Sequence, residues 1–258
     1  MALARRRRGR ALTIPWELEL AGEPYSASHS KLVVPVRLRD GTEAVLKVAK
    51  ADDWEGDLEP EALRFWGGVG AVRLIDHDPE TRSMLIERCL PGTPLGCGYN
   101  LRALEVAADL LRRLWRPPQV DVRWRSLAEV AGRWAHELPK RYSGRIVDEA
   151  VDAIRALVAT QRTFVLCHQD LHGHNILRAE RESWLAIDAK PIVGEPAYDT
   201  VALVRDHKPT LAELRWRLDA FSDLLELDRE RMRLWGLVKS LAWDGPDEAA
   251  LFAAVRSR

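Results

Sequence analysis

The order of its segments is the feature of this sequence that most constrains the fold. The first third is rich in strand-like runs, whereas most of the chain from residue 101 onward has the apolar spacing of amphipathic helices. Between the two parts lies PGTPLG, residues 91–96, where proline and glycine interrupt regular structure. Strands followed by helices predict an α+β fold with two lobes, and a cleft between lobes is the default place for a small ligand.

Residues 12–90 are predicted to form an N-terminal lobe, an antiparallel sheet with one helix. Asp40 and Gly41 separate the first two Val- and Leu-rich runs, and this dipeptide favours a β-hairpin. The helix is predicted at 59–68, because Pro60 suits its first turn and two glycines end it. The strand-like runs are residues 31–40, 42–50, 71–75 and 83–88.

Residues 91–258 are predicted to form a mostly helical C-terminal lobe. Its amphipathic runs are interrupted once, by two short strand-like segments. The predicted helices are residues 101–115, 124–138, 145–160, 196–205, 210–226, 229–242 and 246–256, and the predicted strands are residues 163–166 and 183–188.

Length, charge and cysteine usage limit the classes of protein to consider. A chain of 258 residues is long enough for two lobes with cores of their own. The 39 basic residues balance the 39 acidic ones, so overall charge gives no reason to expect a nucleic-acid partner. No run approaches the roughly 20 apolar residues of a membrane span. Three cysteines without a C-x-x-C pair fit a reducing compartment. We therefore expect a cytoplasmic monomer.

The N-terminal residues 1–11 are the exception to this balance, because they contain RRRRGR. A solvated, frayed terminus is the favoured interpretation, and a basic arm on nucleic acid is the alternative. No apolar segment follows the arginines, as it would in a secretory signal.

The segment TFVLCHQDLHGHNILRAERESWLAIDAKP, residues 163–191, holds the densest group of reactive side chains. His168, Asp170, His172 and His174 alternate, and zinc would accept such ligands on one face of a strand, although a glycine within the set would break that strand. A polar turn without chemistry is a second interpretation. Both interpretations stay open beside a third, phosphoryl transfer.

The third interpretation is phosphoryl transfer. Asp170 and Asn175 have the D-x-x-x-x-N spacing of a kinase catalytic loop. In such a loop the aspartate accepts the proton of the attacking hydroxyl and the asparagine holds Mg²⁺. Asp188, directly after the run SWLAI, has the position of a second metal-binding carboxylate.

A kinase also needs a strand lysine in its first lobe, and AVLK supplies Lys47. Alternation along the strand puts Lys47 on the same side as Val45 and Ala49, which is predicted to face the nucleotide cleft. A helix carboxylate must orient this lysine, and Glu59 and Glu61 begin the one helix predicted in this lobe.

Three stretches resemble the aminoglycoside phosphotransferase family, whose fold is similar to that of protein kinases. HQDLHGHNIL, residues 168–177, is similar to the H-G-D-x-H-x-x-N loop of that family, and ERCLPGTPL, residues 87–95, to its hinge segment. AIDAKPIVGEPAYDTVALVRD, residues 186–206, resembles the D-x-K-P and E-P-x-Y-D stretch of the branch that contains streptomycin 6-phosphotransferases and hydroxyurea phosphotransferases. The resemblance covers about residues 25–245.

This resemblance implies a protein-kinase-like fold and transfer of the γ-phosphate of ATP, with Mg²⁺, to a hydroxyl of a small molecule. Asp170 is then the catalytic base, and His168 braces its loop. Asn175 and Asp188 are the implied Mg²⁺ ligands, and Asp199 is the implied anchor of the catalytic loop.

The resemblance also assigns the nucleotide site. Lys47 is implied to pair with the ATP phosphates, and Glu59 is preferred to Glu61 as the partner of Lys47. The backbone of the hinge from Glu87 to Cys89 is implied to hydrogen-bond adenine.

The chain departs from the family pattern in the catalytic loop, at two residues, and in the predicted phosphate loop. Gln169 stands where the family usually has glycine, and His174 stands where glycine or asparagine is common. The predicted phosphate loop, YSASHSKLVV, has no glycine. Ser28, between Ser26 and Ser30, is the candidate for exposing backbone N–H groups to phosphate there. This loop motivates a nucleotide-binding pseudokinase as the alternative to an active kinase.

The predicted substrate is an antibiotic-type small molecule, streptomycin-like first, with hydroxyurea or a non-antibiotic metabolite as alternatives. A cationic substrate needs paired carboxylates in its pocket. Trp235 and Trp243 are candidates for lining that pocket. The acids of the later helices that might serve are Asp206, Asp219, Glu226, Asp244 and Glu248.

Overall fold

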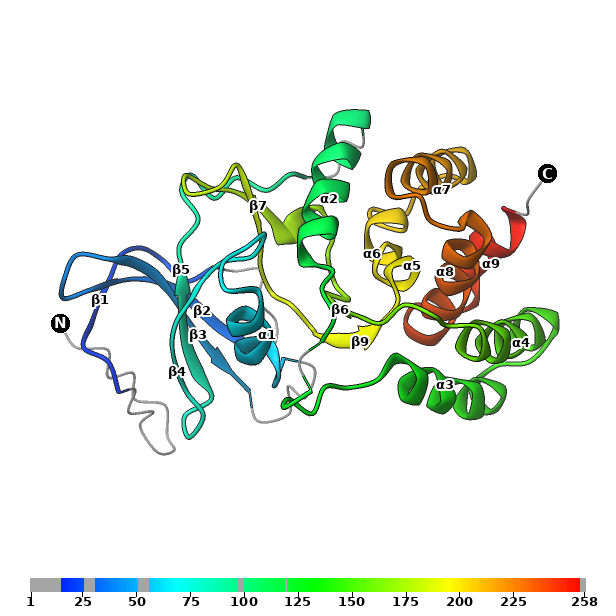
Figure 1. The fold of residues 1–258 in the computed structure, drawn as a ribbon, viewed down its shortest axis with the longest axis horizontal. Helices are drawn as coiled ribbons and strands as arrows, with labels where there is room; N and C mark the ends of the chain where they lie inside the picture. The colour runs from blue at the N-terminus through cyan, green and yellow to red at the C-terminus, as the bar shows by residue number, and fades with distance from the viewer. Residues whose placement is uncertain (1–14, 26–30, 51–55, 97–99, 119, 256–258) are drawn as a thin grey trace.

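The structure is a computed structural model that describes residues 15–25, 31–50, 56–96, 100–118 and 120–255. A sheet with one helix lies at one end of the elongated molecule, and most of the helices lie at the other (Figure 1). The predicted arm of residues 1–11 falls outside the described residues. Among the described helices, none is both long and apolar enough to cross a membrane.

The predicted antiparallel sheet of the N-terminal lobe is present and has five strands. Its hairpin turn lies at Asp40 and Gly41, where the N–H of Gly41 donates to the carbonyl of Leu38 over 3.0 Å. In spatial order the strands are β1 (Leu18–Leu20), β2 (Lys31–Leu38), β3 (Glu43–Ala49), β5 (Ser83–Glu87) and β4 (Leu74–Asp78).

Two strands of this sheet differ from the prediction. β1 was not expected, because it is three residues long and too short to show alternation. β4 begins at Leu74, not at residue 71, because the preceding residues pair with the other lobe. Val72 donates its N–H to the carbonyl of Ala186 over 3.1 Å, and Ala186 donates its own to Gly70 over 2.9 Å.

The helix α1 (Glu59–Trp66) packs on one face of this sheet. Pro60 lies in its first turn, and Gly67 ends it in a left-handed conformation with φ 58°. Val45 belongs to the large core that contains the apolar residues of α1, whereas Leu46 belongs to a small separate core on the opposite face. The side of β3 that carries Val45 and Lys47 therefore faces α1.

The C-terminal lobe is mostly helical, as predicted. Most of the side chains of its central helix, α8, are buried, and this helix packs against α4, α7 and α9. The predicted helix over 196–205 is two short helices, with Thr200 between them. The helices are α2 (Leu101–Leu114), α3 (Leu127–Arg141), α4 (Arg145–Ala159), α5 (Pro196–Asp199), α6 (Val201–Val204), α7 (Leu211–Leu225), α8 (Arg229–Trp243) and α9 (Pro246–Ala254).

Two small antiparallel strand pairs lie between the lobes (Figure 1). β6 (Val165–Cys167) pairs with β9 (Ile192–Gly194), and β7 (Ile176–Arg178) pairs with β8 (Trp184–Ala186). β6 and β8 were predicted approximately, whereas β7 and β9 are too short to be recognised from alternation. The loop from β6 to β7 and the loop from β8 to β9 carry the candidate catalytic residues.

Two glycines in helices give a matched test of this packing. A methyl group on Gly236 of α8 would overlap the ring of Phe252 of α9, whereas one on Gly132 of α3 would enter open space. We expect Gly236→Ala to lower the free energy of unfolding by about 1–3 kcal/mol through overpacking. Gly132→Ala should raise it by about 0.5–1 kcal/mol, because alanine favours helix. Urea unfolding measures both, and a shift of the same sign in both variants would contradict the packing described.

Candidate active site

The ammonium of Lys47 lies between carboxylates from both lobes. Its Nζ is 2.5 Å from Oε1 of Glu59 and 2.9 Å from Oδ1 of Asp188. Lys47 is 4% exposed and Glu59 is fully buried, whereas the side chain of Asp188 is 38% exposed. Glu61 instead pairs with Arg64 on the surface. Of the two candidate glutamates, Glu59 is therefore the one that orients the lysine.

Asp188 occupies an unusual backbone conformation two residues beyond the end of β8. Its φ is 60°, in the left-handed region that residues other than glycine seldom adopt. The N–H of Lys190 donates to the carbonyl of His168 over 3.1 Å and so ties this turn to the catalytic loop. Non-glycine residues persist in this conformation where surrounding contacts determine it, and such residues cluster at functional sites.

The catalytic loop is anchored to α5 through the fully buried carboxylate of Asp199. This carboxylate accepts the backbone N–H of His168 over 3.0 Å and that of Gln169 over 2.6 Å, and Nε1 of Trp115 donates to it over 2.9 Å. Gln169, where the family usually has glycine, has φ 70°. Its carbonyl accepts a hydrogen bond from the buried ammonium of Lys239. Contacts on both sides therefore hold Gln169 in a conformation that suits glycine.

Asp170, next along the loop, presents one carboxylate oxygen to Lys190. The Nζ of Lys190 donates to Oδ2 over 2.7 Å, and Oδ1 accepts no hydrogen bond from the described residues. Burial raises the pKa of the Asp170 carboxyl, but the charge and the hydrogen bond of Lys190 outweigh burial and hold that pKa below its ordinary value. Asp170 is therefore ionised at neutral pH, with an acceptor oxygen left for a ligand.

The ring of His168 is turned into the protein core. Its Nε2 donates to the carbonyl of Ile187 over 3.0 Å, and the ring stacks on Trp66 with 6.0 Å between centroids. Burial lowers the pKa of His168, so the imidazole is neutral and braces the loop. This orientation removes His168 from the zinc arrangement considered above. Within the described part of the chain, no group of three or more His, Cys, Asp or Glu residues could hold a metal ion.

Asn175 and Asp188 lie just beyond the same end of the β7–β8 pair, Asn175 before β7 and Asp188 after β8. Ile176 is opposite Ala186, and the N–H of Ile187 donates to the carbonyl of Asn175 over 3.0 Å. The side-chain Nδ2 of Asn175 donates to the carbonyl of Asp170 over 2.9 Å, which leaves its amide oxygen for a ligand. The two side chains thus offer oxygen donors, which fit Mg²⁺.

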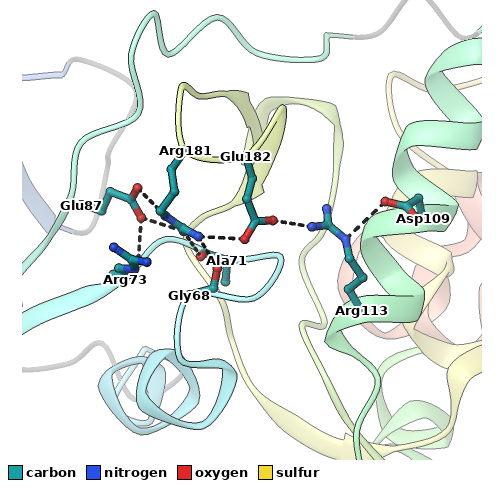
Figure 2. Close-up of polar contacts among 8 residues, drawn as sticks. All are labelled: Gly68, Ala71, Arg73, Glu87, Asp109, Arg113, Arg181 and Glu182. Carbon is teal, nitrogen blue, oxygen red and sulfur yellow. Dashed lines mark hydrogen bonds and ion pairs between the residues drawn. The ribbon is translucent and has the colours of Figure 1, made fainter.

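The hinge begins at Glu87, the last residue of β5. Its carboxylate is bound by the guanidinium of Arg181 from the C-terminal lobe (Figure 2). The backbone groups of Cys89 form no hydrogen bond with the described residues. Burial raises the pKa of the Cys89 thiol to about 12, so this side chain is not a thiolate. Ser28, predicted for the phosphate loop, lies outside the described residues.

A cavity of about 480 Å³ opens beside Asp170. Carboxylates outnumber fixed cations on its walls, because Arg205 and Lys208 face five acidic side chains. Arg205 pairs with one of these acids, and Lys208 lies 3.5 Å from another. The acids that line the cavity are Asp170, Asp206, Asp244, Asp247 and Glu248.

Other candidate pocket residues lie elsewhere. Trp235 is buried and donates its Nε1 to Glu195, and neither Trp235 nor Trp243 lines this cavity. Asp219 pairs with Arg229, and Glu226 ends α7.

Sequence reasoning missed three cations of the site. Lys190 stands in the D-x-K-P motif, and this motif was the one signal that could have identified it. Lys239 lies on α8 and Arg205 directly follows α6, and neither has any local signal. Lys239 is fully buried between the rings of Tyr198 and Trp243, and burial lowers its pKa to about 8.

A sheet with a buried lysine–glutamate pair, joined to a helical lobe with a D-x-x-x-x-N loop, is the architecture of the protein-kinase-like small-molecule kinases. A thermostable mutant of aminoglycoside phosphotransferase APH(4)-Ia, solved with ADP and hygromycin B, has the same fold with a TM-score of 0.60. The two chains are 15% identical, and the match covers 94% of this chain and 95% of the other.

The chain belongs to the aminoglycoside/hydroxyurea antibiotic resistance kinase family, whose model matches residues 15–246. A hydroxyurea phosphotransferase of Kitasatospora aureofaciens is 40% identical, over 92% of this chain and 72% of its own. A streptomycin 6-kinase of Streptomyces griseus is 36% identical, over 90% of this chain and 80% of its own. The protein is therefore a phosphotransferase that acts on a small molecule, as the family resemblance implied.

Glu59 and Glu61 provide a matched pair of variants. Glu59→Gln leaves the buried ammonium of Lys47 with Asp188 as its one remaining carboxylate among the described residues. We expect the free energy of unfolding to fall by about 3 kcal/mol, as when a buried ion pair loses a partner. Glu61→Gln removes an exposed pair and should change it by less than about 1 kcal/mol. Urea unfolding of both variants measures the difference, and equal effects would contradict the assignment of Glu59.

Proposed function

We propose that this protein transfers the γ-phosphate of MgATP to a hydroxyl of a cationic, antibiotic-type small molecule, streptomycin-like first. The observation that carries the proposal is the placement of two groups. Lys47 joins Glu59 and Asp188 across the lobes, and Asp170 stands ionised at an acidic cavity on the C-terminal side. The Lys47 group suits the phosphates of the nucleotide. Asp170 and the acidic cavity suit the small molecule that accepts the phosphate.

The N-terminal lobe and the hinge would hold the nucleotide. Lys47, oriented by Glu59, pairs with the phosphates, and the unpaired backbone groups of Cys89 hydrogen-bond adenine. Because adenine would be bound by the backbone of the hinge, the side chain of Cys89 has no polar role in this proposal. The ADP complex of the solved relative is consistent with nucleotide binding in this fold.

Asn175 and Asp188 are the residues that would hold Mg²⁺. Once bound, the ion neutralises phosphate charge and orients the phosphates for transfer. Asp188 would contribute a carboxylate to Mg²⁺, and Asn175 would contribute a neutral amide oxygen. The two protein ligands would then carry one negative charge between them.

Asp170 accepts the proton of the attacking hydroxyl through Oδ1. Lys190 occupies Oδ2, so the carboxylate has one free oxygen and a fixed orientation. The anchors at Asp199 and Lys239 hold the backbone on which Asp170 is mounted. Such positioning lets the chain contribute mainly orientation and electrostatics to the transfer.

The acidic cavity supports a cationic acceptor. Ammonium or guanidinium groups taken from water need anions, and the excess of carboxylates over fixed cations supplies them. Streptomycin carries guanidinium groups and is the substrate named for the relative that is 36% identical. Hydroxyurea, the substrate named for the relative that is 40% identical, is the second candidate. It is neutral and small, so it would use little of this cavity. The reaction fits the cytoplasm, where ATP is made.

Asp170→Asn tests the catalytic role. The amide keeps the size of the side chain but is a poor proton acceptor. We expect kcat to fall by about 10²–10⁴-fold, the usual contribution of a positioned base, while ADP affinity and the unfolding midpoint stay near those of the wild type. Single-turnover transfer and calorimetric ADP binding measure the two quantities. A variant that keeps most of its kcat would refute the role of Asp170.

A coupled ADP-release screen tests the substrate. We expect saturable turnover with streptomycin first among streptomycin, other aminoglycosides, hydroxyurea, viomycin-type peptides and simple amino alcohols. Turnover should cease with EDTA and return with excess Mg²⁺, because both predicted metal ligands are oxygen donors. If a non-antibiotic metabolite alone gave saturable turnover, the resistance function would be wrong and the kinase function would stand. Turnover that resists EDTA would contradict the metal site.

A further inference from the structure

The guanidinium of Arg181 uses all of its N–H groups at the junction of the lobes (Figure 2). Nε donates to Oε1 of Glu87 over 2.8 Å, and Nη2 donates to Oε2 over 2.9 Å. Nη1 donates to the carbonyl of Gly68 over 2.7 Å, and Nη2 donates to that of Ala71 over 3.1 Å. The remaining N–H of Nη1 donates to Glu182 over 2.7 Å. Arginine has five such donors, and here each has an acceptor.

These acceptors lie on both sides of the lobe junction. Arg181 and Glu182 belong to the turn between β7 and β8 in the C-terminal lobe, whereas Gly68 and Ala71 lie in the loop that follows α1, and Glu87 begins the hinge. The charges continue from Glu182 to Arg113 and Asp109 on α2 (Figure 2). One side chain therefore ties the end of α1, the hinge and the β7–β8 turn together.

The three tied segments carry the parts of the nucleotide site. α1 begins with Glu59, the partner of Lys47, and β8 leads to Asp188. The hinge supplies the free backbone groups of Cys89. A shift of the loop after α1 relative to β8 would change the separation between the N-terminal and C-terminal groups that surround Lys47.

We propose that Arg181 is a positioning residue for the nucleotide site, which aligns the hinge and α1 with Asp188 from outside the site. This inference rests on the proposed function, because it assumes that the hinge and Lys47 bind the nucleotide. Arg181 acts through these groups and does not touch the nucleotide itself.

The contacts differ from those of an ordinary surface ion pair. The side chains of Arg181 and Glu87 are 21% and 19% exposed, and two acceptors of Arg181 are backbone carbonyls. The hydrogen bonds and charge of Glu87 outweigh burial and raise the pKa of Arg181. Lysine keeps the charge but cannot reproduce a planar, bidentate contact together with two carbonyl contacts. Arg181→Lys should therefore lose most of the alignment.

Calorimetric binding of ADP to the full chain tests the proposal, with KM for ATP and for the accepted substrate measured beside it. Arg181→Met should weaken ADP binding by about tenfold, the upper range of effects for residues remote from a ligand, and raise KM for ATP. KM for the acceptor should stay at the wild-type value, because the acidic cavity lies outside the tied segments. A distortion that reached both binding sites would instead raise both KM values.

Arg178→Met is the matched control, because Arg178 is an exposed arginine on β7 that contacts the ring of Trp184. It should bind ADP like the wild type. Glu87→Gln should weaken binding in the same direction as Arg181→Met but by less, and the double variant should be no weaker than Arg181→Met alone, since Arg181→Met already removes the contact with Glu87. Wild-type ADP affinity in folded Arg181→Met would overturn the inference. So would an equal loss in Arg178→Met.

If Arg181→Met failed to fold, Arg181→Lys and Glu87→Gln would decide, and wild-type affinity in both would overturn the inference. Failure of the wild-type protein to bind ADP would overturn the proposed function first and this inference with it. Normal ADP binding by the wild type with an unaffected Arg181→Met would reject the inference alone and leave the proposed function standing.

Discussion

The ion pair of Lys47 with Glu59 is the interaction on which the rest of the site depends. It places a buried ammonium where the sheet, α1 and the C-terminal lobe meet, and such a charge is stable only with paired anions. Glu59 fixes the lysine from the N-terminal side and Asp188 approaches it from the other lobe. Through these two contacts the ammonium links the lobes at the place where the proposed function puts the phosphates of a nucleotide.

The catalytic loop shows how the fold supports an unfavourable local conformation. Gln169 adopts a left-handed backbone at a position where the family usually has glycine. Asp199 and Lys239 compensate from opposite sides by binding its N–H and its carbonyl. Asp170 follows this fixed residue, and Lys190 orients its carboxylate. The loop is therefore preorganised by residues from α5, α8 and the turn after β8, far apart in the sequence.

The sequence predicted what depends on local chemistry. The order of strands and helices identified the two lobes. The D-x-x-x-x-N spacing identified Asp170 and Asn175, and position on or after a strand identified Lys47 and Asp188. In the structure Lys47 contacts Asp188, and Asn175 contacts Asp170. What it could not predict depends on distant contacts. Arg181 and Glu87 are separated by 94 residues, and nothing in the neighbourhood of either one marks the pairing. The sequence around Lys239 is that of an ordinary amphipathic helix. Only the fold brings its ammonium to the carbonyl of Gln169. Strands of three residues, such as β7 and β9, carry no alternation from which to recognise them.

Lys47 is proposed to bind the phosphates of a nucleotide. Calorimetric titration of Lys47→Met with ATP and with adenosine, both in excess Mg²⁺, tests this role most directly, because adenosine lacks the phosphates but keeps the base that the hinge would bind. We predict that the variant binds ATP at least about tenfold more weakly than the wild type, as expected from the loss of a charge-assisted contact, and binds adenosine equally well. Equal losses for the two ligands, or unchanged ATP affinity in a folded variant, would contradict it.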